Sequence, residues 1–338
     1  MRFSRPSPRK TIGAALAGLA LVLSVGACSS GGAAGADGGD TIEVNFGYIP
    51  DFNGTSLLAV AEDQGLWEKH GIDATTSSFT NGPLQIQALG TGDLDFGYIG
   101  PGAFWLPASG QAKLVAMNTL GRADRVVAQP GIESVEDLKG KTVAVPEGTS
   151  GDMILTLALE DAGMTKEDIE LVPMEPPAIV AALSSGQVDA AGFWYPALAT
   201  VKEQVPDLVE LADNTDFEDK VAFPTAFVAG NDVVADEPEK VDAVLTVLRE
   251  AMAYRSENMD ETIELTAEFN NLDVADVEAD AANVEVLDLA ELDKITEDGT
   301  VDTWLSGMND YFVEAGTLEA PVDPAEYYTG DLFLKAGE

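Results

Sequence analysis

Hydrophobic and polar residues follow two kinds of pattern along the chain after residue 41. Short apolar or alternating runs, typical of strands, are separated by longer segments whose apolar residues recur every three or four positions, as in helices. The predicted strands are 42–49, 72–79, 94–99, 142–145, 170–174 and 190–193. Strands that alternate with helices predict an α/β protein with parallel-rich sheets and flanking helices.

The helical segments carry recognisable end signals. Thr55 or Ser56 is expected to cap the first helix, because a hydroxyl there can accept from a free backbone N–H group. After residue 237 the pattern becomes mainly helical, with an apolar face along 241–252 and acidic residues on the other side. Further helices are predicted at 261–269 and 303–315, which gives a helical C-terminal region.

One unit of the sequence occurs twice. Residues 88–95 (ALGTGDLD) can be laid over residues 182–189 (ALSSGQVD), 94 positions later. Each copy follows a helix opened by proline and precedes an apolar strand that ends in aromatic residues and proline. Repetition of one unit at this distance predicts two similar lobes. The alternative is a chance likeness between two junctions of a helix, a glycine turn and a strand.

The N-terminal segment has the features of a secretion signal. Four basic residues precede an apolar run that ends at Ala27, and the sole cysteine, Cys28, follows directly. This arrangement resembles a bacterial lipobox, in which the cysteine is lipidated and becomes the mature N-terminus. We therefore predict a lipoprotein signal peptide at 1–27 and a flexible, glycine-rich tether at 28–41. An ordinary secretory peptide with an incidental cysteine is the alternative.

Composition excludes several functional classes. The 338 residues include 59 acidic and 18 basic side chains, and the net charge of −41 is the opposite of what a nucleic-acid binder needs. Loss of the basic leader would make the net charge −45. One cysteine and one histidine, His70, exclude an internal disulfide, a cysteine-rich metal site and a multi-histidine metal site. We expect no catalytic residues, no metal and no cofactor.

Four stretches resemble the taurine/nitrate/sulfonate substrate-binding proteins of ABC importers. They are 46–48 (FGY), 88–95, 138–146 (LKGKTVAVP) and 193–198 (FWYPAL). The resemblance implies a two-lobed periplasmic-binding-protein-like fold of type II, with two crossing strands and the ligand between the lobes. It places lobe 1 at 42–122 plus 227–317, lobe 2 at 123–226, and a C-terminal tail at 318–338. The crossings are expected near 120–127 and 223–229.

The ligand site is expected at the carboxyl ends of the parallel strands, where open α/β sheets bind ligands. Helices begin after most of these ends, and their free N–H groups favour an anionic group. Glu147 instead suits the ammonium group of a zwitterion, or it is a solvent-facing turn residue. The predicted ligand-binding residues are Tyr48, Phe52, Asn53, Thr80, Asn81, Gly82, Tyr98, Glu147, Thr149, Ser150, Gly151, Trp194, Tyr195, Phe223 and Thr225.

The resemblance implies an extracytoplasmic solute-binding protein, held on the membrane by the lipid on Cys28, that acts with a permease and an ATPase. Because no Arg or Lys falls in the predicted cleft loops, a small sulfonate, taurine-like or zwitterionic solute is favoured. A pyrimidine or riboflavin precursor, an amine, and a sensor role beside a membrane kinase are the alternatives. We expect a monomer. The fold also includes a thiamin-pyrimidine synthase with a cysteine-rich motif, which this chain lacks.

Overall fold

The structure is a computed structural model that describes residues 41–338. The predicted signal peptide, the lipidation residue Cys28 and nearly all of the tether lie outside the described residues. Within the described residues, the helices are too short or too polar to cross a membrane.

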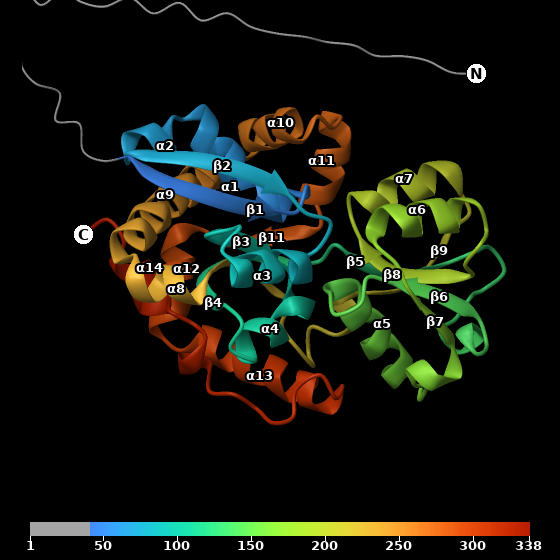
Figure 1. Ribbon diagram of the computed structural model, residues 1–338. Coiled ribbons are helices and arrows are strands. Elements are labelled where there is room, and N and C mark those ends of the chain that lie inside the picture. The colour runs from blue at the N-terminus through green and yellow to red at the C-terminus, as the bar shows by residue number, and fades with distance from the viewer. Residues whose placement is uncertain (1–40) are drawn as a thin grey trace, which may run out of the picture. The chain divides into compact units, whose positions relative to one another are not determined.

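Two mixed β-sheets form the framework (Figure 1). The first has the strand order β11-β4-β10-β3-β1-β2 and the second has the order β7-β6-β8-β5-β9. The strands of the first sheet are β1 (Ile42–Tyr48), β2 (Ile72–Ser78), β3 (Phe96–Ile99), β4 (Lys113–Gly121), β10 (Pro224–Ala229) and β11 (Val284–Val286). Those of the second are β5 (Asp124–Ala128), β6 (Thr142–Val145), β7 (Glu170–Pro173), β8 (Ala190–Trp194) and β9 (Val209–Asp213). The predicted α/β class is confirmed.

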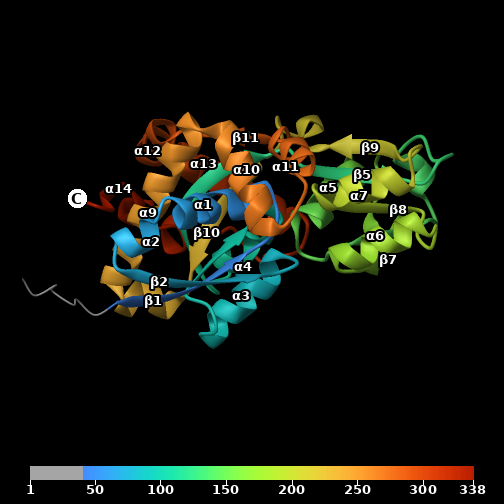
Figure 2. The same ribbon diagram turned by 90° about the horizontal axis from the view of Figure 1, so that it is seen from above.

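Helices flank both sheets, as the two views in Figures 1 and 2 show. Those after the strands of the first sheet are α1 (Phe52–Asp63), α2 (Leu66–Lys69), α3 (Gly82–Thr91) and α4 (Trp105–Ala108). Those of the second sheet are α5 (Ser150–Asp161), α6 (Pro176–Ser184) and α7 (Ala197–Gln204). The C-terminal helices are α8 (Asn231–Asp236), α9 (Pro238–Glu257), α10 (Met259–Asn270), α11 (Val274–Ala281), α12 (Leu289–Glu297), α13 (Thr300–Glu314) and α14 (Gly330–Lys335).

The repeated sequence unit corresponds to a repeated structural unit. In the first sheet β2, β1 and β3 are parallel neighbours, and antiparallel β10 follows; in the second sheet β7, β6, β8 and antiparallel β5 have the same order. The aligned residues Asp95 and Asp189 make the same contact. The Asp95 carboxylate accepts from the Asn45 N–H group at 2.7 Å, and the Asp189 carboxylate from the Thr142 N–H group at 2.9 Å.

The chain passes between the sheets at two places. The first passage, from β4 to β5, takes only residues 122–123 and lies inside the predicted crossing at 120–127. The second passage runs from the end of β9 to the start of β10, over residues 214–223. It therefore precedes most of the predicted segment 223–229, which is largely β10 itself. The sequence pattern located the apolar strand but not the irregular segment before it.

The cap predicted for the first helix is wrong. The helix begins at Phe52, and the Asp51 carboxylate accepts from the Gly54 N–H group at 2.6 Å. Thr55 and Ser56 lie inside the helix and are buried. The apolar periodicity starts one turn late because the first turn, Phe-Asn-Gly-Thr, is mostly polar although it is buried.

The segment after β3 and the start of α5 are in close backbone contact at Gly102. This residue follows β3, and a methyl group on it would stand 2.1 Å from the carbonyl carbon of Thr149, at the start of α5. Only a residue without a Cβ atom allows these backbones to be so close. The contact holds the end of the first sheet against the helix that follows the second sheet's β6.

Gly102→Ala is expected to separate the sheets, because the added methyl group clashes with backbone atoms that cannot rotate away. We predict a larger radius of gyration by small-angle X-ray scattering and a loss of about 1–3 kcal/mol of stability, the usual range for overpacking. Gly90→Ala, where nothing lies within 4 Å of the added group, is the matched control. An unchanged radius in Gly102→Ala would show that the contact is dispensable.

Candidate ligand-binding site

A small cavity lies between the two sheets, with a volume of about 40 Å³. Both sheets contribute to its wall. It includes eight of the residues predicted from the sequence: Asn53, Gly82, Tyr98, Thr149, Ser150, Trp194, Tyr195 and Thr225. Its volume suits a head group of a few atoms, since one water molecule needs at least about 10–15 Å³.

Five predicted residues lie away from this cavity. The Tyr48 ring packs edge-on against Phe269, with 5.4 Å between ring centroids, and Phe52 is buried against α10 and α11. Phe223 is part of the main core. Gly151 packs directly on the Gly192 backbone, and Glu147 is exposed to solvent. The ammonium-binding role suggested for Glu147 would therefore require it to turn inward.

Thr80 and Asn81 connect the two sheets instead of lining the cavity. The Thr80 hydroxyl and the Asn81 side-chain amide donate to the same oxygen of Glu175, at 2.6 and 2.7 Å. Asn81 caps α3 beside the first sheet, and Glu175 precedes α6 beside the second sheet. The three residues form a polar bridge across the mouth of the cleft, which we call the Glu175 bridge.

Two cavity residues absent from the sequence prediction are aspartates. Asp51 follows β1 and caps α1, and Asp124 is the first residue of β5. Their side chains are only 6% and 4% exposed. Their positions, after β1 and at the first crossing, could have identified them as cleft residues from the sequence. Because the chain has 59 acidic residues, no single one of them stands out. The described residues that line the cavity include no Lys or Arg.

A third aspartate, Asp280 of α11, lies behind the first two. Its Oδ2 atom accepts from the Phe52 N–H group at 2.6 Å, so two carboxylates occupy the N-terminus of α1. Burial raises the pKa of Asp280 to about 7, and the charge of Asp124 adds to that rise. Burial likewise raises the pKa of Asp51 well above its usual range, with the charge of Asp280 as the next cause.

Asp124 is held by the second passage between the sheets. Its N–H group donates to the Asn214 side chain at 2.8 Å, and the Asn214 amide donates to Asp124 Oδ2 at 3.1 Å. Burial raises the pKa of Asp124, while the Ser150 hydroxyl and the Asn214 amide lower it. In the described part of the chain, Asp124 Oδ1 is buried and accepts no hydrogen bond of ordinary geometry, and the Ser150 hydroxyl that lowers the pKa is the donor beside this side chain.

A buried cation lies one layer behind the cavity. Arg255 of α9 is fully buried and donates to Ser56 at 3.0 Å and to Asn118 at 2.9 Å. Asn118 in turn donates to the Asn53 carbonyl oxygen at 2.8 Å. Burial lowers the pKa of Arg255 to about 9. Its hydrogen bonds fix α1 and β4 behind the cavity, and its guanidinium is not part of the cavity wall.

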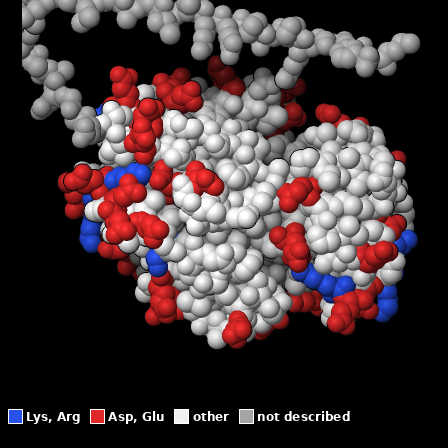
Figure 3. All heavy atoms as spheres, viewed as in Figure 1, with Lys and Arg blue, Asp and Glu red and all other residues white. Residues whose placement is uncertain are grey.

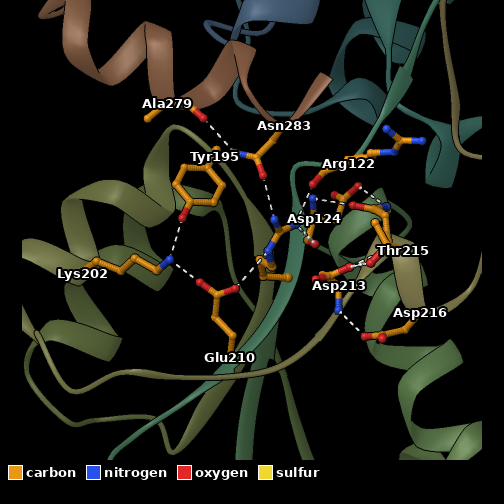
Figure 4. Close-up of polar contacts among 12 residues, drawn as sticks. Arg122, Asp124, Tyr195, Lys202, Glu210, Asp213, Thr215, Asp216, Ala279 and Asn283 are labelled. Atoms are coloured by element: carbon orange, nitrogen blue, oxygen red, sulfur yellow. Dashed lines mark hydrogen bonds and ion pairs between the residues drawn. The ribbon is translucent and has the colours of Figure 1, made fainter. Parts of the chain in front are cut away.

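The Tyr195 side chain is fixed by polar contacts outside the cavity (Figure 4). Lys202 donates to the Tyr195 hydroxyl at 2.6 Å and also pairs with Glu210, which pairs with Arg125 at 3.2 Å. Arg125 further donates to Asn283 at 2.7 Å, which ties β5 to the segment before β11. The aromatic wall is therefore pre-organised on the side of the second sheet.

The start of α5 has a different arrangement from the start of α1. The Thr149 hydroxyl donates to the Pro146 carbonyl oxygen at 2.6 Å, so this side chain does not cap the helix. Thr149 and Ser150 both line the cavity. The start of α5 therefore has no side-chain cap, and two of its residues face the cavity.

A larger groove of about 550 Å³ adjoins the small cavity. The two share Ile49 and Trp194. The remaining groove wall is mostly apolar and includes Phe79, Pro176, Pro177 and Val180. Its volume falls in the range of small-molecule pockets, about 300–1,000 Å³. A ligand can therefore place a head group in the cavity and an apolar part in the groove.

The aspartates do not form a recognisable metal site. Over residues 41–338, no group of three or more Asp, Glu, His or Cys side chains is arranged to hold a metal ion. Acidic side chains are also abundant on the surface, as Figure 3 shows for one face.

Two sheets of this topology with a cavity between them define a protein of the periplasmic-binding-protein fold. The family model described as NMT1/THI5 like matches residues 53–262, and the chain belongs to this family. A "Putative binding protein" of Brucella abortus (strain 2308) is 54% identical over 294 residues, which are 87% of this chain and 92% of that protein.

More distant relatives carry more specific names. A "Putative aliphatic sulfonates-binding protein" of Bacillus subtilis (strain 168) is 28% identical over 284 residues, or 80% of this chain and 82% of that protein. The alkanesulfonate-binding protein SsuA from Xanthomonas axonopodis pv. citri, solved with bound MOPS, has a TM-score of 0.70 at 22% identity and covers 86% of this chain and 99% of its own. The predicted resemblance to the sulfonate/taurine/nitrate substrate-binding family is confirmed.

The fold is not restricted to binding proteins. The desulfurization enzyme DSZB has a TM-score of 0.65 at 16% identity, covering 87% of this chain and 98% of its own. At this identity the likeness concerns the fold alone. The relatives by sequence described above are named as binding proteins.

The raised pKa of Asp280 predicts a pH-dependent stability. A folded-state pKa of about 7 means that the folded protein holds this proton more tightly than the unfolded chain does. The contribution is fully present below about pH 4 and is lost as the pH rises through 7. We expect the free energy of unfolding to fall over that window, by at most about 1.4 kcal/mol per pH unit for one proton.

Asp280→Asn should make this decrease shallower, because the amide does not ionise and can still accept from Phe52. Denaturant unfolding of the ligand-free protein at pH 5, 6, 7 and 8 measures the slope. Glu278→Gln, an exposed residue of the same helix, should keep the original slope. Equal slopes in Asp280→Asn and the unaltered protein would contradict the assignment.

Proposed function

We propose that this protein is the extracytoplasmic solute-binding component of an ABC importer. It captures a small organic solute between lobe 1, residues 42–122 plus 227–317, and lobe 2, residues 123–226. The observation that carries the proposal is the cavity whose wall comes from both sheets. A solute that contacts both sheets stabilises the closed conformation, and a permease can recognise that conformation.

The proposal assigns binding and release to the protein and no chemical reaction. The one histidine, His70, is bonded to Glu250 at 3.0 Å and is not among the residues that line the cavity. The cavity wall of the described chain contains hydroxyl, amide, carboxylate and aromatic groups. Among the described residues, the wall contains no histidine, lysine or cysteine that would activate a nearby hydroxyl or act as a nucleophile. We therefore take the likeness to DSZB as a shared fold without a shared reaction.

The partners follow from the proposed role. We propose a permease and an ATPase of the cognate importer as protein partners, and a lipid on Cys28 as the link to the outer face of the cell membrane. The strongly negative mature chain favours a monomer, since copies repel one another. We propose that the glycine-rich segment 28–41 joins that lipid to the folded part of the chain.

Binding is tested with a thermal-shift panel of taurine, alkanesulfonates, nitrate, amino acids, amines and pyrimidines, followed by calorimetry of the best solute. Trp194→Ala should weaken that binding because it removes apolar wall shared by the cavity and the groove. Ser150→Ala should weaken it by about 0.5–3 kcal/mol, the range for one hydrogen bond. Gly90→Ala serves as the control. Unchanged affinity in both site variants, with folding intact, would place the ligand elsewhere.

Membrane attachment has a separate test. Cys28→Ala removes the thiol that would carry the lipid, so the protein should move from the membrane fraction to the soluble fraction. Fractionation and intact mass spectrometry of the mature N-terminus provide the readout. Continued membrane retention of an unlipidated chain would contradict a lipid anchor while leaving the binding role untouched.

A further inference from the structure

The charges around the cavity favour a particular class of solute. Two of its wall residues, Asp51 and Asp124, are buried carboxylates, and Asp280 lies behind them. Two cations lie near these carboxyl groups. Arg255 donates its hydrogen bonds to Ser56 and Asn118. Arg125 lowers the pKa of Asp124 by its charge, but its hydrogen bonds go to the Arg122 and Asp124 backbone oxygens, to Asn283 and to Glu210. A buried carboxylate is costly without a partner that offers positive charge or hydrogen-bond donors. The described cavity wall offers no Lys or Arg side chain as that partner.

The hydrogen bonds already made show which carboxylate oxygen is left. Asp51 accepts from Gly54 and Asp280 accepts from Phe52, both at the start of α1. Asp124 Oδ2 accepts from Asn214. Among the described residues, Asp124 Oδ1 and Asp280 Oδ1 are both buried without a hydrogen bond of ordinary geometry, and of these two aspartates only Asp124 lines the cavity. A donor that reaches Oδ1 from the cavity would satisfy the oxygen that the protein leaves free.

The same bonds disfavour an anionic head group at this end of the cavity. The start of α1 would be an anion site if its N–H groups were free. Here the carboxyl groups of Asp51 and Asp280 already accept from two of these N–H groups, so they are not free for an anion. A sulfonate also has no N–H group to give to Asp124. The sulfonate preference suggested by the distant relatives' names is therefore poorly matched by this cavity.

The apolar groove indicates that the part of the solute beyond the head group is apolar. Trp194 borders both the cavity and the groove, and Ile49 does the same from the first sheet. A solute whose head group reaches Asp124 would extend along Trp194 between the prolines of α6 and the end of β2. The indole and the Tyr195 ring also attract a cation through their π-faces.

We propose that the solute is a small organic cation whose protonated nitrogen, as a primary ammonium or an amidinium, donates to Asp124 and faces Asp51. Its apolar portion lies along Trp194 in the groove. This inference rests on the proposed solute-binding function and deepens it by naming the ligand class. Asp124 acts as the hydrogen-bond acceptor and counter-charge, and Asn214 holds it in place.

Four probes with the same ring test the charge and the donor separately. Isothermal titration is run with benzamidine, benzylamine, benzyltrimethylammonium and benzenesulfonate on the mature chain. We expect the first two to bind. Benzyltrimethylammonium has the charge without an N–H group, so it should bind at least about tenfold more weakly. Benzenesulfonate should show no binding.

Asp124→Asn is the decisive variant. Its amide oxygen can still face Asn214, so the fold should persist and the melting temperature of the free protein should be equal or higher. Benzamidine affinity should fall by about 10- to 150-fold, as expected for a lost charge-assisted hydrogen bond. Asp213→Asn, the same charge change at a residue outside the cavity wall, should leave the affinity unchanged.

The outcomes separate the inference from the proposed function. Benzenesulfonate or taurine binding that depends on Trp194 would overturn the cationic class and keep the solute-binding role. Failure of both benzamidine and benzylamine to bind would also overturn the inference, whatever solute the thermal-shift panel identifies. Equal benzamidine affinity in Asp124→Asn and the unaltered protein would show that the carboxylate does not contact the cation.

Discussion

The structure around the cleft depends on the burial of three carboxyl groups, two at the start of α1 and one at the start of β5. Asp51 and Asp280 accept from the first N–H groups of α1, which brings the C-terminal helix α11 against the carboxyl end of β1. Asp124 follows the first passage between the sheets and lines the same cavity as Asp51. The N–H groups at the start of α1 offset part of the cost of burying these carboxyl groups, but they are fewer than the carboxyl oxygens that need a hydrogen bond. A solute that donates to one of the remaining oxygens is therefore favoured.

The duplicated unit explains why the cavity lies where it does. Both sheets place a central parallel strand between two others and end the group with an antiparallel strand. In each copy an aspartate precedes the third strand of the unit, Asp95 before β3 and Asp189 before β8. Its carboxylate accepts from a backbone N–H group of the first strand, β1 or β6. The carboxyl ends of the two sets of strands supply residues to one cavity, Tyr98 from one and Trp194 from the other. Two similar units thus provide opposite walls with different chemistry.

The sequence predicted the six strands β1–β3 and β6–β8, the repeat, and eight of the cavity residues, because apolar periodicity and strand ends are local signals. It could not identify Asp280 as a partner of α1, since 228 positions separate it from Phe52. It misplaced the cap of α1 because Asp51 precedes a polar first turn that is buried only by tertiary packing. Glu147 follows a strand end as a cleft residue should, but the chain turns at Gly148, with φ of 70°, and leaves this side chain in solvent. The direction in which such a side chain points depends on the backbone conformation of the turn, which cannot be predicted from residue type alone.

The Glu175 bridge bears on how long a solute stays bound. Thr80, Asn81 and Glu175 join the two sheets without lining the small cavity, so their hydrogen bonds favour closure whichever solute is present. The apparent affinity of a solute depends on the fraction of molecules already in the binding-competent arrangement. A stronger bridge would raise that fraction and lengthen the residence time, and it would equally slow release. Glu175 is exposed, although Asn81 is only 5% exposed, so water competes for the shared carboxylate oxygen and limits the strength of the bridge. A bridge of limited strength would suit the proposed role, in which a bound solute must also be released.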